Sequence, residues 1–317
     1  MKKALICGIS GQDGAYLAKF LLAKGYQIFG TSRDAQAASF SNLNKLGILN
    51  SVKTCSMALN DFRSVLNVLN QVEPDEVYNL SGQSSVGLSF EQPVETMETI
   101  SLGTLNMMEA IRFLSKKIRF YNAGSSECFG ETTADDPADE STRFSPRSPY
   151  AVAKSAAHWQ VASYREAYGL FACTGILFNH ESCLRPERFV TRKIVESARR
   201  IAKGSKETLV LGNIKVIRDW GWSPEYVEAM WRILQIDTPE DFVIATGRSI
   251  SLEHFVELAF AEFNLDWNKY VKTIAELFRP LDLVQSHANP ARAKKKLGWH
   301  AKHKVEDVVR FMVEEKL

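Results

Sequence analysis

The sequence predicts an α/β fold in which helices cover both faces of a doubly wound parallel sheet. Over the first 180 residues, short apolar runs alternate with segments whose apolar residues recur at helical spacing. Glycine, proline or a capping residue separates neighbouring segments. Strands that alternate with helices of this length pair in parallel through right-handed crossovers, which gives a doubly wound sheet.

The strands are expected where the apolar runs lie, and the helices between them. The strand ranges are 4–7, 27–31, 51–57, 76–80, 119–123 and 171–178, and the helix ranges are 13–24, 61–71, 94–114 and 148–168. Gly25 ends the first helix, and Asn60 or Asp61 caps the second. Ser148 caps the fourth helix, and Pro149 suits its first position because a proline has no amide that would stay unpaired there.

Beyond residue 180 the alternation loosens and aromatic residues become more frequent. Residues 242–245 are expected to form a strand that returns to the main sheet, and the tail from 252 is expected to be mostly helical, with a break at Arg279-Pro280. We therefore predict a nucleotide-binding domain at 1–179, with about 215–247 returning to it. A smaller, interleaved C-terminal substrate domain is predicted at 180–214 and 248–317.

The composition is that of an ordinary globular protein without a strongly charged surface. Hydrophobic residues make up 45% and charged residues 24% of the chain, and the net charge is only +2. A net charge this close to zero does not suggest a surface that binds nucleic acid or a membrane. The five cysteines are odd in number and show no C-x-x-C spacing, and no secretory or membrane-spanning run is found, so we expect a reduced, cytoplasmic protein. Histidine and cysteine spacing indicates no metal site.

The glycines Gly8, Gly11 and Gly14 lie between the first strand and the first helix. Small residues there let the backbone approach a pyrophosphate, and the helix N-terminus supplies free amides and positive potential. An unliganded tight turn is the alternative. The end of the second strand carries Arg33 and Asp34, which suit a 2′-phosphate and a ribose 2′-hydroxyl respectively. Because Arg33 comes first, NADP is favoured over NAD.

Tyr150 and Lys154 lie one turn apart on the fourth helix and therefore share a face. A tyrosine that acts as a base at neutral pH needs its pKa lowered from about 10, which requires on the order of 4 kcal/mol. A nearby ammonium and a positive nicotinamide favour the phenolate. The alternative is an ordinary amphipathic helix with a packed tyrosine and an exposed lysine.

Three consecutive polar residues follow the fifth strand, at the edge of the sheet where ligands bind in such folds. Ser125 and Ser126 offer hydroxyls to a substrate oxygen, and Glu127 offers a carboxylate that can remove the proton beside a newly formed ketone. The alternative role of Glu127 is a negative charge at the N-terminus of the following segment. Hydride transfer alone needs no such carboxylate, so Glu127 discriminates between reactions.

Seven motifs spread over nearly the whole chain carry a family resemblance. They are Gly8-Ile-Ser-Gly-Gln-Asp-Gly14, Glu76-Val-Tyr-Asn-Leu80, Tyr150-Ala-Val-Ala-Lys154, Gly175-Ile-Leu-Phe-Asn-His-Glu-Ser182, Phe189-Val-Thr-Arg-Lys193, Arg218-Asp-Trp-Gly221 and Phe278-Arg-Pro280. In these motifs the chain resembles the GDP-mannose 4,6-dehydratase family of extended short-chain dehydrogenases/reductases, which have a Rossmann domain.

The resemblance implies an NADP-dependent lyase of nucleotide-sugar and deoxysugar metabolism. GDP-mannose would become GDP-4-keto-6-deoxymannose by internal hydride transfer and loss of water. Tyr150 would take the proton of the sugar 4-hydroxyl, while Glu127 would remove the C5 proton and help to expel the 6-hydroxyl. Ser125 stands where the family usually has threonine.

The resemblance also implies the site residues. The catalytic residues are Ser125, Glu127, Tyr150 and Lys154. The cofactor-binding residues are Gly8, Ser10, Gly11, Gln12, Asp13, Gly14, Arg33, Leu59, Leu80, Ser81, Gly82, Ser84, Tyr150, Lys154, His180 and Arg185. The substrate-binding residues are Ser84, Ser125, Ser126, Glu127, Asn179, Val190, Lys193, Gly212, Arg218, Arg279 and Asp282.

The chain departs from the family pattern at four further places, which are Ala58 and Asp282 in place of acidic residues (aspartate and glutamate), Arg33-Asp34 in place of two arginines, and Pro186 in place of glycine. The alternatives are therefore a relative that acts on another GDP-hexose or heptose, a 4-epimerase or a 4-keto reductase. A non-catalytic NADP-binding regulator is the alternative from another class.

The resemblance further implies a homodimer or homotetramer. In the family, the helices at 94–114 and 150–168 form a dimer bundle. Here they carry apolar residues on more than one face, including Ile111, Phe113, Trp159 and Val161. The partners expected are thus a nucleotide sugar and further copies of the chain.

Overall fold

The main sheet has seven parallel strands, as predicted. The computed structural model describes residues 1–278 and 281–317. The strands are β1 (Lys3–Cys7), β2 (Gln27–Ser32), β3 (Val52–Ser56), β4 (Glu76–Asn79), β5 (Arg119–Ala123), β6 (Ala172–Leu177) and β10 (Phe242–Ile244). Their order is β10-β6-β5-β4-β1-β2-β3, and every neighbouring pair is parallel. The winding direction reverses between β1 and β4, where ligands bind in doubly wound sheets.

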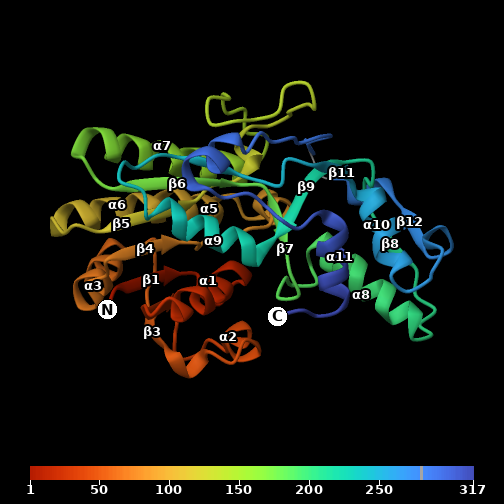
Figure 1. Ribbon diagram of the computed structural model, residues 1–317, viewed down its shortest axis with the longest axis horizontal. Helices are drawn as coiled ribbons and strands as arrows, with labels where there is room; N and C mark the ends of the chain where they lie inside the picture. Colours follow the sequence, from red (N-terminus) through yellow and green to blue (C-terminus); the bar gives the residue numbers. More distant parts are fainter. Residues whose placement is uncertain (279–280) are drawn as a thin grey trace.

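Helices cover both faces of this sheet (Figure 1). One face carries α1 (Gln12–Ala23) and α9 (Ser223–Ile233), which pack together in one apolar core. The other face carries α3 (Phe62–Val72), α6 (Gly103–Leu114) and α7 (Pro149–Tyr168), whose apolar side chains form a second core. The short helices α2 (Ser41–Lys45) and α4 (Val86–Glu91) were not predicted.

The predicted helix starts are confirmed by their caps. Asp61 accepts a hydrogen bond from the amide of Arg63 and caps α3, and the Ser148 hydroxyl accepts from the amide of Ala151 at 3.0 Å and caps α7. The single helix predicted at 94–114 consists of α5 (Pro93–Met97), a π-helical turn η2 (Glu98–Leu102) and α6. The widened turn leaves the helix continuous.

The strand expected at 242–245 is confirmed, because β10 pairs in parallel with β6 at the edge of the main sheet. The remaining strands were missed. A three-stranded sheet contains β7 (Asn179–Glu181), β9 (Ile217–Trp222) and β11 (Ser249–Ser251), and a two-stranded sheet contains β8 (Leu209–Leu211) and β12 (Val271–Thr273). The tail beyond residue 252 is therefore helical only in part, and the predicted break at Arg279-Pro280 lies outside the described residues.

A separate apolar core joins these small sheets to α8 (Val190–Ala202), α10 (Leu252–Ala261) and α11 (Val305–Val313). In Figure 1 these elements gather at the right, beyond the carboxyl ends of the main strands. Within residues 1–278 and 281–317, no helix is long and apolar enough to cross a membrane. The same residues contain no cluster of histidine, cysteine or acidic side chains suited to a metal ion.

Candidate active site

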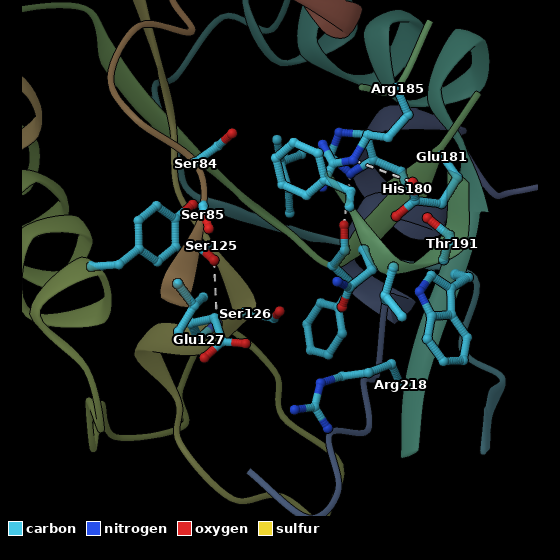
Figure 2. A pocket seen from close by; sticks show the side chains of 18 of the residues that line it. Ser84, Ser85, Ser125, Ser126, Glu127, His180, Glu181, Arg185, Thr191 and Arg218 are labelled. Atoms are coloured by element: carbon cyan, nitrogen blue, oxygen red, sulfur yellow. Dashed lines mark hydrogen bonds and ion pairs between the residues drawn. The ribbon is translucent and has the colours of Figure 1, made fainter. Parts of the chain in front are cut away.

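A pocket of about 290 Å³ lies between the main sheet and the small sheets. Figure 2 shows Ser84, Ser85, Ser125, Ser126 and Glu127 on one wall, and His180, Glu181, Arg185 and Thr191 on the facing wall, with Arg218 near one end. The first wall is made by the segments that follow β4 and β5, because parallel neighbours end at the same edge. The facing wall is made by β7, β9 and the start of α8.

Most of the predicted site residues line this pocket. They are Asp13, Leu80, Ser81, Gly82, Ser84, Ser125, Ser126, Glu127, Tyr150, Lys154, Asn179, His180, Arg185, Val190, Gly212, Arg218 and Asp282. Eight others lie elsewhere in the fold and do not line it, namely Gly8, Ser10, Gly11, Gln12, Gly14, Arg33, Leu59 and Lys193. Arg279 lies outside the described residues.

The glycine-rich turn packs too closely for side chains. Gly8 has a φ of +81°, and a Cβ on Gly14 would lie 2.5 Å from the carbonyl oxygen of Gly8. The N-cap of α1 is Gly11, which offers no side-chain cap, so the first amides of this helix remain available to a ligand. The turn is thus shaped as a backbone cradle for an anion at a helix N-terminus.

Tyr150 and Lys154 are both buried beside the end of β5. The Lys154 ammonium donates a hydrogen bond of 2.8 Å to the carbonyl of Ala123, and burial lowers the pKa of Lys154 to about 8. The ammonium lies 5.8 Å from the centroid of the Tyr150 ring. An exposed lysine, which the ordinary-helix alternative requires, is therefore not what this helix carries.

Burial raises the pKa of the Tyr150 phenol, and a hydrogen bond with Ser125 opposes this only in part. The chain by itself thus holds Tyr150 as a neutral phenol. The Ser125 hydroxyl also accepts a hydrogen bond of 3.3 Å from the amide of Glu127, which fixes the short turn η3 (Ser126–Cys128). The turn after β5 thus places Ser125 and Glu127 at the sheet edge, where Ser125 meets Tyr150 of α7.

A partly buried ion pair connects the glycine-rich turn with β7. His180 Nε2 lies 2.8 Å from Oδ2 of Asp13, and His180 Nδ1 lies 2.7 Å from the carbonyl oxygen of Phe178. Both partners are acceptors, so both ring nitrogens carry protons and His180 is an imidazolium. Burial opposes the charge on His180, but the charge of Asp13 overcomes it and raises the pKa of His180.

Asp13 is held as a carboxylate by three donors. Besides His180, it accepts hydrogen bonds from the side-chain amide of Gln12 at 3.1 Å and from the Ser223 hydroxyl at 2.8 Å. Burial works in the other direction, yet these partners lower the pKa of Asp13 below its usual range. Gln12 also accepts from the Ser182 hydroxyl at 2.7 Å, so the network ties together α1, α9 and the segment after β7.

The cations of the facing wall differ in their partners. The Arg218 guanidinium lies 3.3 Å from Oδ1 of Asp282 and donates at 2.9 Å to the carbonyl of Leu283. Arg185 lies 3.2 Å from Glu181 and stacks over the ring of Phe189. Lys193 donates to the carbonyl of Val210 instead of lining the pocket.

Arg33 and Asp34, which gave a mixed signal in the sequence, differ in their contacts. One carboxylate oxygen of Asp34 accepts hydrogen bonds from the amides of Gln36 and Ala37, at 2.9 and 3.1 Å. This carboxylate therefore caps its own turn. The Arg33 side chain is 80% exposed and lies 3.5 Å from Glu95. An exposed pair of this kind is weak and readily exchanged for another anion.

Known proteins place the chain in a family. A family model described as GDP-mannose 4,6 dehydratase matches residues 5–312. The chain belongs to the GDP-mannose 4,6-dehydratase family. GDP-mannose 4,6 dehydratase 2 of Arabidopsis thaliana is 44% identical over 326 residues, which cover 100% of this chain and 87% of that protein. GDP-mannose 4,6-dehydratase of Vibrio cholerae is 42% identical over 350 residues, which cover 100% and 94%.

Solved structures of similar fold include enzymes with different reactions. The UDP-glucose 4-epimerase of Thermus thermophilus matches with a TM-score of 0.86 and 23% identity, covering 99% of this chain and 98% of that one. The dTDP-glucose 4,6-dehydratase of Bacillus anthracis matches with a TM-score of 0.87 and 16% identity, covering 99% and 96%. These likenesses confirm the fold, and the fold alone does not distinguish an epimerase from a dehydratase.

Several pocket residues of this GDP-mannose 4,6-dehydratase family member were missed from the sequence. Ser85 and Gln83 follow β4 and line the pocket, and the sheet-edge rule that found Ser125 applies equally to them. Arg188 and Thr191 also line it. Thr191 lies within the motif from Phe189 to Lys193 and Arg188 directly before it, but the motif does not show which of these side chains line the pocket, because that depends on how α8 meets the small sheets.

The Asp13–His180 pair predicts a defined pH dependence of stability. The pKa of His180 in the folded protein is raised above its ordinary value of 6.5. The stabilisation that the pair adds to the folded protein is therefore complete below pH 6.5, and it is lost as the pH rises through the folded-state pKa. Asp13→Asn is expected to destabilise the protein by about 3 kcal/mol near pH 6, with a smaller loss at alkaline pH. Urea unfolding from pH 5.5 to 9 measures this difference.

The control for this pair is Glu257→Gln, which removes the partner of His254 in an exposed pair at 2.9 Å. Its effect on unfolding is expected to stay below about 0.5 kcal/mol at every pH. An Asp13→Asn loss that does not shrink toward alkaline pH would show that His180 is not charged in the folded protein.

Proposed function

We propose that this chain is a GDP-mannose 4,6-dehydratase, which converts GDP-mannose to GDP-4-keto-6-deoxymannose with NADP as cofactor. The observation that carries the proposal is that Glu127 lines the same pocket as Ser125, Tyr150 and Lys154. A tyrosine and lysine suffice for hydride transfer at one carbon, whereas the added carboxylate supplies a second proton acceptor beside the same sugar. The five free cysteines suit the reducing conditions of the cytoplasm, where we expect the enzyme to act.

The residues present fit a dinucleotide. The tight turn from Gly8 to Gly14 leads into α1, whose first amides have no side-chain cap and so remain available to a pyrophosphate. When bound, the oxidised nicotinamide supplies a positive charge and a place for a hydride to leave sugar C4 and return to C6. Because burial raises the pKa of Tyr150, Lys154 alone does not make this phenol a base. The positive charges of Lys154 and cofactor together favour the phenolate.

The chain's own residues then move the protons. Tyr150 accepts the proton of the 4-hydroxyl as the C4 carbonyl forms, and Ser125 donates a hydrogen bond to that oxygen. The carbonyl acidifies the C5–H bond, so Glu127 removes this proton and the electron pair forms the C5=C6 bond as the 6-hydroxyl leaves. Glu127 passes the proton to the leaving hydroxyl, which departs as water. The proton that Tyr150 took from the 4-hydroxyl is transferred to C5, and with the hydride returned to C6 this completes the 6-deoxy product and restores Tyr150.

The facing wall suits a nucleoside diphosphate. Arg218 is buried and lines the pocket, and a guanidinium binds phosphate oxygens well. The N-cap of α8 is Phe189, which makes no side-chain cap, and the next residues, Val190 and Thr191, line the same pocket. Uncapped amides at the start of this helix add positive potential for an anion.

NADP is favoured over NAD by the residues after β2. One oxygen of the Asp34 carboxylate accepts from two amides of its own turn, so this side chain has a capping role that needs no ribose. Arg33 is exposed and has only a weak pair with Glu95, so it can turn to a 2′-phosphate. Both observations favour the phosphorylated cofactor.

The primary test uses GDP-mannose and NADP with the purified protein. We expect a product lighter by one water by mass spectrometry, without net accumulation of NADPH. Glu127→Gln is expected to lower turnover roughly 10²- to 10⁴-fold while the affinity for NADP stays unchanged, because it removes the base and leaves the cofactor site intact.

Three outcomes would contradict the assignment to a GDP-mannose 4,6-dehydratase. Full turnover by Glu127→Gln would favour a 4-epimerase or a 4-keto reductase, which need no base at this position. Absence of product with bound NADP would direct the search to other GDP-hexoses or heptoses. Absence of turnover on every sugar would favour a regulator.

The cofactor choice is tested by titrating NADP and NAD. Arg33→Ala is expected to raise the Kd of NADP roughly tenfold, the effect of losing one charge-assisted hydrogen bond, and to leave the Kd of NAD within twofold. Asp34→Asn is the matched control, since asparagine can still cap the turn, and it is expected to change neither value. A weaker affinity for NAD in Asp34→Asn would instead assign Asp34 to the ribose.

We also propose that the chain self-associates through the surface of α5, η2, α6 and α7. Of the residues considered from the sequence, Ile111 and Val161 are buried in the core, whereas Phe113 and Trp159 are exposed by 68% and 61%. Other large apolar side chains exposed on these elements are Val94, Met97, Leu102, Val152 and Tyr168. An exposed apolar surface of this extent is typical of an interface between copies.

Light scattering at micromolar concentration tests this proposal. We expect at least a dimer for the natural chain and weaker association for Trp159→Glu, since a buried charge at an interface is costly. Ile274→Glu is the control, because this exposed apolar residue follows β12, away from α7. A monomer at these concentrations would overturn the proposal.

A further inference from the structure

Residues 131–138, here called the strap, follow the turn that carries Glu127. They belong to the yellow-green loop at the top of Figure 1. Glu131 opens the strap, and its two carboxylate oxygens accept hydrogen bonds from consecutive amides, from Val284 at 3.1 Å and from Gln285 at 2.9 Å. The strap is thereby fastened to a segment of chain some 150 residues away.

This distant segment, residues 282–289, is here called the clasp. Thr132 and His287 exchange two hydrogen bonds, from the His287 amide at 2.7 Å and to the His287 carbonyl at 3.0 Å. On its other side the clasp pairs with β9, because Ile217 donates to the carbonyl of Val284 at 2.8 Å and accepts from the amide of Ser286 at 3.0 Å. The clasp is therefore held between the strap and β9.

The clasp supplies the partners of Arg218. The guanidinium donates to the Leu283 carbonyl and pairs with Asp282, the two residues that come immediately before the amides bound by Glu131. Arg218 is only 7% exposed, so it has little freedom to find other partners. The position of its charge thus depends on where the clasp lies.

We propose that Glu131 is a positioning residue, which holds the clasp so that Arg218 meets the diphosphate of the nucleotide sugar at a fixed distance from Glu127. The inference rests on the proposed function. Glu127 and Glu131 lie on one short stretch of chain. The same segment therefore carries the base and binds the clasp, whose residues hold Arg218. Without the carboxylate, two neighbouring amides lose their acceptors just beside the partners of Arg218.

The role is distinct from a general contribution to stability. Glu131 is exposed, and the strap keeps other bonds to the clasp, such as that from the Ala138 amide to the His287 carbonyl at 2.9 Å. Loss of the carboxylate is therefore expected to loosen residues 282–285 locally. The glycine-rich turn and Tyr150 make no contact with this carboxylate among the hydrogen bonds of the described residues, so the cofactor site is expected to stay unchanged.

The test measures the binding of GDP by calorimetry. Glu131→Ala is expected to raise the Kd of GDP about three- to tenfold, the effect of losing one or two partly exposed hydrogen bonds. Glu131→Gln is expected to show a smaller rise, because its amide oxygen still accepts one of the two bonds. The control is Asp135→Ala on the same strap, whose exposed side chain has no hydrogen bond or ion pair among the described residues, and it is expected to change nothing.

A double-mutant cycle decides whether Glu131 acts through Arg218. In an Arg218→Lys background, Glu131→Ala is expected to add less than twofold to the Kd of GDP, since the anchor that it positions is already altered. Equal and additive effects, or an equal loss of NADP affinity, would overturn the proposal. Because the probe is GDP itself, this result is independent of whether the natural protein dehydrates GDP-mannose.

Where turnover is measured, the same variants separate binding from chemistry. Glu131→Ala is expected to raise the KM for GDP-mannose by the same factor as the Kd of GDP, with a smaller effect on kcat. A fall in kcat alone would contradict a role in placing the diphosphate. Absence of turnover in the natural protein, with the GDP result as expected, would contradict the proposed function and leave the role of Glu131 standing.

Discussion

The ion pair between Asp13 and His180 is the interaction on which the pocket depends. It joins residues 167 positions apart and brings the start of α1 against β7. A charge pair that is largely removed from water is favourable only when its remaining polar atoms are also bonded. Gln12, Ser223 and the Phe178 carbonyl meet that condition. The nucleotide cradle and the facing wall are therefore fixed relative to each other before any ligand arrives.

A second constraint is the burial of Tyr150 and Lys154 at the end of β5. Burial works against charge on both side chains, because it raises the pKa of the phenol and lowers that of the ammonium to about 8. The resting site therefore keeps Tyr150 neutral. Chemistry that needs a phenolate must bring positive charge with it, which links the reactivity of Tyr150 to the binding of an oxidised dinucleotide.

The sequence was sufficient for features set by local interactions. The strands of the main sheet, the caps Asp61 and Ser148 and the Gly8–Gly14 turn follow from periodicity and from hydrogen bonds within a few residues. The three-residue strands β7, β8, β11 and β12 carry too few residues for a period to be visible. β7 and β11 form on the two sides of β9, and β8 and β12 pair with each other, so all four depend on contacts between distant parts of the chain.

The same distinction applies to the site. Ser125, Glu127, Tyr150 and Lys154 could be placed from the sheet-edge rule and the helix spacing, and they line one pocket. The resemblance implied that Asp13 and His180 contact the cofactor, but no pattern showed that they pair with each other. Asp34 was ambiguous because an aspartate after a strand can bind a ribose or cap a turn, and only the positions of two amides decide between them.

In the proposed mechanism, the short segment that carries Glu127 and Glu131 serves both chemistry and binding. The first lines the pocket, and the second binds the clasp outside it. Since elimination at C5 and C6 requires the sugar to sit at a set distance from the base, the diphosphate must be anchored at a set distance as well. One backbone segment sets the position of Glu127 and, through Glu131 and the clasp, the position of Arg218. A shift of this segment therefore moves the base and the residue that binds the diphosphate in the same direction.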